Sequence, residues 1–158
     1  VLHVGVLGIG LNLRAEFTGN VLEDGKVLGT AHVATGWNYE GDARTVQHLG
    51  ALGYRVLSAG QVRPAREAAP GLTQVNCHVD PIRWKRGADF RGTESTLEKL
   101  VAHLAARRHG EADPLEPTGL LTHHLDTCET TWGFVEELFA RLSHRDAVHW
   151  VRLSRAAG

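Results

Sequence analysis

The sequence is short of the features that mark secreted, membrane-spanning or polyanion-binding proteins. It has only two cysteines, Cys77 and Cys128, far apart and outside any CxxC spacing, so neither a disulfide framework nor a zinc knuckle is indicated. No uninterrupted apolar run approaches the roughly 18 residues that a membrane-spanning helix needs. With 17 Lys+Arg against 18 Asp+Glu, the net charge of -1 gives no electrostatic reason to expect nucleic acid or an anionic membrane as a partner. We therefore expect a cytoplasmic protein that binds neither.

Methionine is also missing, even at position 1, which suggests a processed, trimmed or partial chain. The length of 158 residues favours one domain, able to bury roughly two thirds of the surface that the unfolded chain exposes. Residues 1–35 are rich in β-type patterns, and Asp24-Gly25 between apolar pairs is a strong hairpin signal. This β-rich N-terminal segment should pair in antiparallel fashion and precede a larger α/β unit at 36–158.

From Asp42 onward, helical and strand-like patterns alternate, which predicts parallel strands with covering helices, in an open sheet or part of a barrel. A first helix should follow Asp42 and stop at Gly53. The expected strands lie at 54–59, 72–80, 119–122 and 148–151.

Two further helices have recognisable start signals. Ser95-x-x-Glu98 has the pattern of a capping box, and Asp126-x-x-Glu129 resembles one. The first of these helices should end near Gly110. Apolar residues at helical spacing define the face that each helix should turn to the core: Leu97, Leu100, Val101 and Leu104 in one, and Trp132, Val135, Leu138, Phe139 and Leu142 in the other.

Polar side chains stand where two of the expected strands end. His78 and Asp80 close one strand, with Trp84 in the loop beyond it, and His123-His124 close the next. The C-terminal ends of parallel strands converge on one rim, where sites are usually built. A pair at i and i+2 on a strand points to one face, so His78 and Asp80 could share a pocket in which the carboxylate fixes the imidazole tautomer. That geometry suits acid–base chemistry or metal ligation.

A purely structural interpretation stands beside this one. Asp80 could cap the turn at Pro81, with His78 a hydrogen-bonded core residue. The adjacent histidines that close the next strand send their rings to opposite faces, so at most one enters a given pocket. Cys77 is expected to be a buried, inert thiol, and histidines on helices, such as His103, should face solvent.

Two stretches, taken together, resemble one family. QVNCHVDPIRWKRG at 74–87 and EPTGLLTHHLDTCETTWGFVEELFARL at 116–142 are similar to the C-terminal half of polysaccharide deacetylase-like proteins of the NodB-homology type, particularly a bacterial subgroup with the patterns VDPIDW and GLLTHHLVHDEATW. The similarity runs from about Trp37 to the end of the sequence.

This resemblance implies a partial or distorted (β/α) barrel and removal of acetyl groups from N-acetylated sugars by a metal-bound water. In the family an Asp and two His hold a divalent metal such as zinc, a second Asp acts as base, and a late His protonates the leaving amine. Asp80 with Trp84 matches the late Asp-x-x-x-Trp motif, and His123 matches the late acid, with His124 next in line. The resemblance thus implies Asp80 and His123 as catalytic residues and Trp84 as a wall of the carbohydrate pocket. Together with the strand-end argument for His78, we expect Trp84, His124 and His78 to contact the carbohydrate.

The chain departs from the family pattern in its first part. It has no Asp-Asp-Gly motif on a first strand, because Glu23-Asp24-Gly25 falls in the expected hairpin turn, and no His-x-x-x-His pair follows. The metal ligands are therefore not identified. Arg83 also replaces the acid often found just before the tryptophan. Either residues 1–35 replace the family's first strands in an inactive or altered protein, or the chain is incomplete.

Two alternatives from other classes follow from these departures. The first is a non-catalytic carbohydrate-binding or assembly module that kept the rim of the fold and lost the metal. The second is a homodimer that buries the open edge of an incomplete barrel, because unpaired strand edges are a liability.

Overall fold

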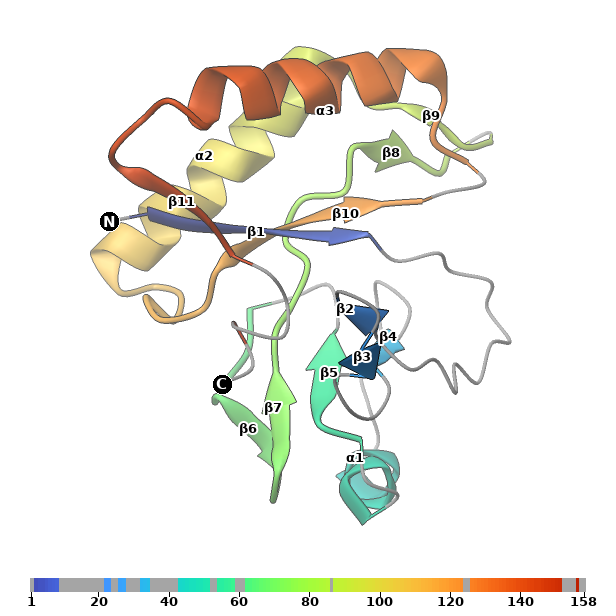
Figure 1. Ribbon diagram of the computed structural model, residues 1–158, viewed down its shortest axis with the longest axis vertical. Coiled ribbons are helices and arrows are strands. Elements are labelled where there is room, and N and C mark those ends of the chain that lie inside the picture. The colour runs from blue at the N-terminus through green and yellow to red at the C-terminus, as the bar shows by residue number, and fades with distance from the viewer. Residues whose placement is uncertain are drawn as a thin grey trace.

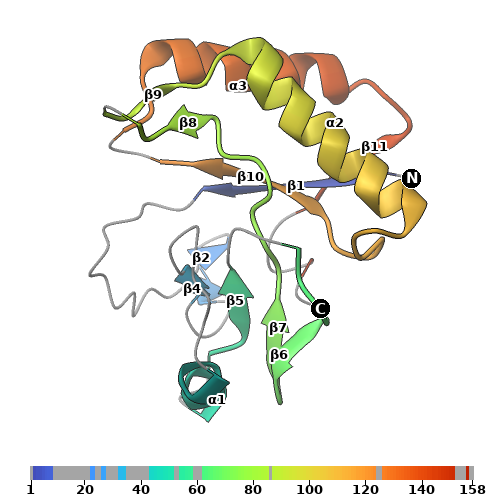
Figure 2. The same ribbon diagram turned by 180° about the vertical axis from the view of Figure 1, so that it is seen from behind.

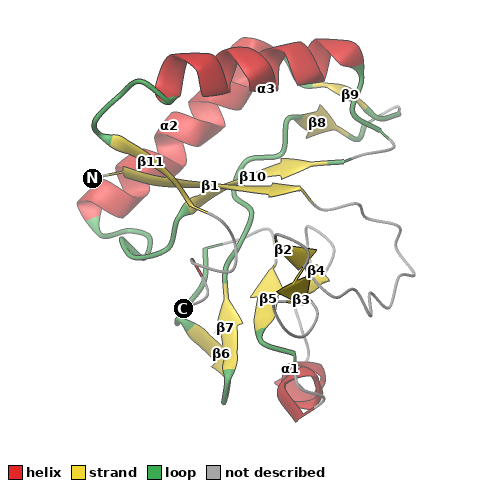
Figure 3. Ribbon diagram, in the orientation of Figure 1, coloured by secondary structure: helices red, strands yellow, loops and turns green. Residues whose placement is uncertain are grey.

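A computed structural model describes residues 2–8, 22–23, 26–27, 32–34, 43–51, 54–58, 62–85, 87–123, 126–151 and 156. These residues form a mixed α/β fold of small sheets covered by helices (Figures 1 and 3). Among them the strands do not close into a barrel, and the partial or distorted barrel stays a prediction. In this same part of the chain, no helix is long and apolar enough to cross a membrane.

The first sheet has the order β10-β1-β11 and is parallel throughout. The central strand β1 (Leu2–Gly8) pairs with β10 (Thr118–Thr122) on one side and β11 (Val148–Val151) on the other. The prediction of antiparallel pairing for the N-terminal segment is wrong for β1. Its nearly continuous apolar run, LHVGVLG, is typical of a strand at the centre of a parallel sheet.

The expected hairpin accounts for a different pair of strands. β2 (Leu22–Glu23) and β3 (Lys26–Val27) run antiparallel on either side of residues 24–25, which lie outside the described residues. The local turn signal therefore predicted the pairing next to it, but it carried no information about the partners of β1.

The second sheet has the order β4-β5-β7-β6 and holds a small core of its own. Its strands are β4 (His32–Ala34), β5 (Val56–Ser58), β7 (Leu72–Gln74) and β6 (Glu67–Ala69), of which the last runs antiparallel to its neighbour. The helix α1 (Ala43–Ala51), placed as predicted, lies against this sheet. Leu57, Ala69 and Leu72 are buried there.

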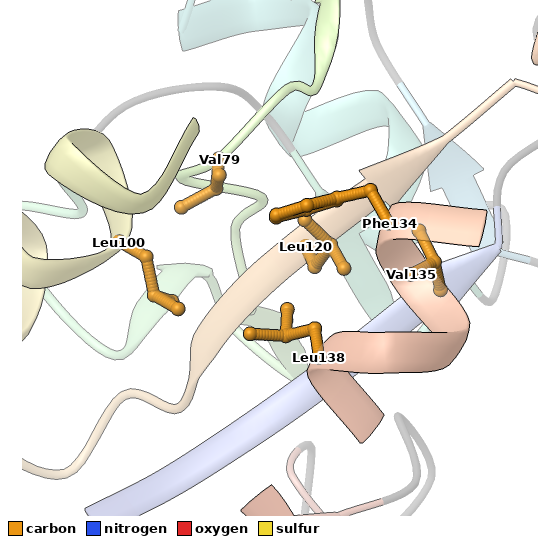
Figure 4. Close-up of a cluster of buried hydrophobic side chains, with 6 residues drawn as sticks. All are labelled: Val79, Leu100, Leu120, Phe134, Val135 and Leu138. Atoms are coloured by element: carbon orange, nitrogen blue, oxygen red, sulfur yellow. The ribbon is translucent and has the colours of Figure 1, made fainter. Parts of the chain in front are cut away.

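Two longer helices, α2 (Thr93–His109) and α3 (Glu129–Leu142), cover one face of the first sheet (Figures 1 and 2). A short antiparallel pair, β8 (Ile82–Arg83) and β9 (Asp89–Phe90), precedes α2. The core beneath the helices contains Val79, Leu100, Leu120, Phe134, Val135 and Leu138 (Figure 4).

The predicted start of α2 is wrong, and so are parts of both predicted core faces. α2 begins at Thr93, so Ser95 lies inside the helix, and no side chain caps its first turn. Leu97 is 37%, Val101 61% and Trp132 38% exposed. The reason in α2 is that its buried face also carries Thr96, His103 and Arg107, which rotates the helix away from the purely apolar stripe. The predicted helix end at Gly110, with its left-handed φ of 77°, is confirmed.

Candidate functional site

The site begins with a bulge where residues 78–79 meet β10. The amides of His78 and Val79 both donate to the Gly119 carbonyl, at 2.8 and 3.0 Å, and the Leu121 amide donates to the Val79 carbonyl at 2.8 Å. Two amides on one carbonyl are the signature of a bulge, in which two residues oppose one on the partner strand. Side-chain alternation is interrupted there, so the prediction that His78 and Asp80 share a pocket fails.

Gly119 makes this close approach possible. A Cβ atom at that position would lie 2.3 Å from the Asn76 carbonyl oxygen and 2.9 Å from the Cys77 Cα. Both are backbone atoms, which cannot move aside by a change of rotamer. The crossing of residues 76–79 over β10 therefore needs a residue without a side chain at this point.

Beyond the bulge, the carboxylate of Asp80 gathers three groups. One of its oxygens accepts a hydrogen bond from the Ile82 amide and the other from Trp84 Nε1, each at 2.8 Å. His123 Nε2 lies 3.3 Å from Asp80 Oδ1, close enough for an ion pair although the ring nitrogen is not aligned for a hydrogen bond. Asp80 is 2% exposed, so these contacts hold it in one orientation. The bond to Ile82 spans Pro81, so the predicted turn-capping role of Asp80 is confirmed.

His123 is fixed at the end of β10 by the turn that follows. Its carbonyl accepts hydrogen bonds from the Asp126 and Thr127 amides at 3.1 and 2.8 Å. Its own amide bonds to the Thr127 hydroxyl at 3.1 Å. His124, the second of the adjacent histidines, lies outside the described residues.

Trp84 forms the exposed border of this arrangement. Its ring meets His123 edge-on, with centroids 4.8 Å apart and an interplanar angle of 81°. It is 50% exposed, while Asp80 and His123 are buried. A half-exposed indole whose N–H is already bonded can offer its apolar face to a sugar ring.

Chemically, Asp80 and His123 form a carboxylate–imidazole pair. With Nε2 turned toward the carboxylate, Nδ1 of His123 is the ring nitrogen left to exchange a proton with a ligand. A positioned imidazole of this kind can donate a proton to a ligand or accept one from it. The arrangement therefore suits proton transfer to or from a ligand that rests against Trp84.

His78 belongs to a different environment, inside the protein. Its Nδ1 accepts a hydrogen bond from the Gly119 amide at 3.0 Å, and its Nε2 lies 3.3 Å from Glu116 Oε2. The ring stacks on His103 with centroids 3.6 Å apart. With its side chain 3% exposed, His78 lies inside the protein. The interpretation of His78 as a hydrogen-bonded core residue is confirmed, and its role as a carbohydrate contact stays a prediction.

Sequence reasoning missed the partners of His78. His103 is buried instead of facing solvent as predicted, and Glu116 is 1% exposed in a stretch that looked like a simple connection. Burial, together with the charges of His78 and Arg107, lowers the pKa of His103 to about 3, so its ring is neutral. One signal was available in the sequence EPTGLLT. A charged residue that directly precedes a short apolar strand can be buried together with that strand.

The prediction of an inert thiol at Cys77 is confirmed. The side chain is buried next to the Ser58 hydroxyl, 3.8 Å away, and burial raises the pKa of the thiol to about 12. A thiol with such a pKa stays protonated at neutral pH and is a poor nucleophile.

The described residues do not fit the divalent metal that the family resemblance implies. Among them, no three His, Cys, Asp or Glu side chains are grouped so that they could hold a metal ion. Both carboxylate oxygens of Asp80 already accept hydrogen bonds from N–H groups. We therefore derive no chemical step through a metal.

Comparison with known proteins adds no relative. No protein-family model matches the sequence, and no curated protein and no solved structure is significantly similar to it.

Proposed function

We propose that this chain is a polysaccharide deacetylase-like protein that hydrolyses the N-acetyl group of an amino sugar, with Asp80 and His123 as its proton-transfer pair. One observation carries the proposal: the buried Asp80 carboxylate lies 3.3 Å from His123 Nε2 and also accepts the indole N–H of Trp84. Three of the predicted site residues, Asp80, His123 and Trp84, thus lie together at the end of β10.

Each residue has a distinct task in the proposed reaction. Trp84 stacks on the sugar ring and places the acetamido group near His123. Water adds to the acetyl carbonyl and gives up a proton to His123, the C–N bond breaks, and His123 passes that proton to the departing amine nitrogen. Asp80 holds the imidazole in the orientation that this transfer needs. His124, outside the described residues, is proposed as a further carbohydrate contact.

A divalent metal such as zinc is the cofactor proposed from the resemblance, although among the described residues no three possible ligands are grouped together. We also propose a cytoplasmic location, because both cysteines are free thiols.

A second candidate function is a carbohydrate-binding or assembly module without catalysis. It is favoured by the missing three-ligand group in the described part of the chain, together with the exposed indole of Trp84. In this case Asp80 and His123 would hydrogen-bond a sugar instead of transferring a proton.

Self-association through an open sheet edge is the third proposal, and sedimentation velocity tests it.

The two main functions separate in one set of assays. Acetate release from N-acetylglucosamine oligosaccharides is measured with added zinc and with a chelator, and binding of the same sugars is measured by calorimetry. Release that disappears in His123→Ala, and persists in the exposed-histidine control His144→Ala, would support the deacetylase. Binding without release would support the module. Neither binding nor release would refute both.

A further inference from the structure

A second carboxylate–imidazole pair lies inside the protein, between Glu116 and residues 76–80, the segment that carries Asp80. Glu116 Oε2 and His78 Nε2 are 3.3 Å apart, close enough for an ion pair although not aligned for a hydrogen bond, and the side chains are 1% and 3% exposed. The other oxygen of Glu116 accepts the Asn76 amide at 2.7 Å. Glu116 therefore contacts the segment at two points, the backbone of residue 76 and the side chain of residue 78.

The charge on Glu116 is balanced by a buried arginine. Arg63 Nε lies 3.8 Å from Glu116 Oε2, and the same guanidinium binds Asp113 at 2.8 to 2.9 Å. Arg63 also donates to the Gln74 carbonyl, just before the segment. A buried charge is tolerated only when it is paired and hydrogen-bonded, so these contacts fix Glu116 in place.

His78 takes part in the bulge through its side chain as well as its backbone. Its Nδ1 accepts the amide of Gly119, whose carbonyl accepts the amides of both His78 and Val79. In a regular ladder the Gly119 amide would bond to a main-chain carbonyl of the neighbouring strand. Here a side chain replaces that carbonyl, which allows the extra residue of the bulge without leaving a buried amide unpaired.

We propose that Glu116 and His78 are positioning residues, which hold the bulge that turns the Asp80 carboxylate toward Trp84 and His123. Without the bulge, alternation would place Asp80 on the same side as His78, facing α2 and away from His123. A polar network in the interior would thus determine the geometry of the rim without touching a ligand. The positioning role rests on these contacts alone. Only the role of Asp80, Trp84 and His123 toward a sugar rests on the proposed function.

The indole N–H of Trp84 provides a direct readout, because its acceptor is Asp80 Oδ2. In a ¹⁵N–¹H spectrum, Trp84→Phe identifies this indole signal, and Asp80→Ala gives its position without the acceptor. In Glu116→Gln and His78→Asn the signal should move at least halfway toward the Asp80→Ala position. The indole of Trp150, which donates to the Ser143 hydroxyl at 3.0 Å, should keep its position in the same spectra.

A core variant separates positioning from general loss of stability. Leu138→Ala removes a buried side chain from the cluster under α3 and leaves the polar network intact. It should lower the denaturation midpoint at least as much as Glu116→Gln does, while the Trp84 signal stays in place.

The proposal is overturned if both network variants fold and leave the Trp84 signal where the wild type has it, or if Leu138→Ala moves it equally. Should Glu116→Gln fail to fold, His78→Asn alone decides, because the Asn Oδ1 takes the place of the ring Nδ1 and can still accept from the Gly119 amide, while the shorter side chain no longer reaches Glu116. No substrate is needed, so a chain that releases no acetate can still show the shift.

Discussion

Replacing Gly119 with alanine tests the close crossing on which the site depends. The new Cβ would stand 2.3 Å from the Asn76 carbonyl oxygen and 2.9 Å from the Cys77 Cα. Ordinary Cβ contacts begin at about 3.4 Å, so the two backbones have to separate by about 1 Å. That movement stretches the bonds from His78 and Val79 to the Gly119 carbonyl and the bond from the Gly119 amide to the His78 ring.

The magnitude follows from those bonds. Weakening two or three buried hydrogen bonds costs about 1 kcal/mol each, and overpacking adds about 1–3 kcal/mol. We expect Gly119→Ala to lower the free energy of unfolding by about 3–6 kcal/mol. For a protein of this size, roughly 2–4 °C of Tm is lost per kcal/mol, so the Tm should fall by roughly 6–24 °C.

Urea denaturation followed by circular dichroism measures this loss, with Gly133→Ala as the matched control. Gly133 lies inside α3, and a Cβ there would meet nothing within 4 Å. Alanine should therefore stabilise the protein by about 0.5–1 kcal/mol through its higher helix propensity. If Gly119→Ala unfolds within about 1 kcal/mol of the wild type, residues 76–77 do not cross β10 as described, and the argument for the bulge fails with them.

Three further predictions concern single side chains. Cys128 is exposed, and hydrogen bonds from Thr131 lower the pKa of its thiol. Cys128 should therefore react with a disulfide reagent at neutral pH, while Cys77 should react only after unfolding. Rapid reaction of both thiols in the folded protein would contradict this. The pKa of His103 is about 3 in the folded protein and near 6.5 in the unfolded chain, so the unfolded chain binds more protons between these two values. The free energy of unfolding should therefore fall by at most about 1.4 kcal/mol per pH unit as the pH drops from 6 to 4. Urea titrations should show a shallower slope in His103→Gln, and an unchanged slope would mean that another group is responsible. Trp84→Ala should weaken carbohydrate binding about three- to tenfold, since aromatic contacts contribute about 0.5–1.5 kcal/mol, and unchanged calorimetric affinity would remove Trp84 from the ligand site.

The sequence pattern of a segment predicted its secondary structure where tertiary packing favours the same structure. The strand at Val148–Val151 and the helix at Ala43–Ala51 were both predicted from spacing and stop signals alone. In α2 the same reasoning found the helix but not its orientation. Leu97 and Val101 continue the apolar stripe at helical spacing, but the helix instead buries the face that carries His103 and Arg107. Spacing along the sequence does not show which of these two faces is buried.

The candidate site shows a similar division. The rule that sites form at strand ends, together with the family motif, singled out Asp80, Trp84 and His123, and the structure brings these three into contact. The separation of His78 from Asp80 was not predictable, because it depends on Gly119, which lies far along the chain and accepts two amides at once. Bulges of this kind arise from pairing between distant segments, which spacing within one segment does not reveal.

The place of β1 at the centre of its sheet also bears on how the molecule assembles. Both of its neighbours, β10 and β11, come from the last third of the sequence, so β1 finds its partners only after these much later segments have left the ribosome. Contacts between such distant segments slow folding. Until then an apolar strand has both edges unpaired, the condition in which strands join with other chains. During synthesis, β1 is therefore a segment that chaperones should shield until β10 and β11 have formed.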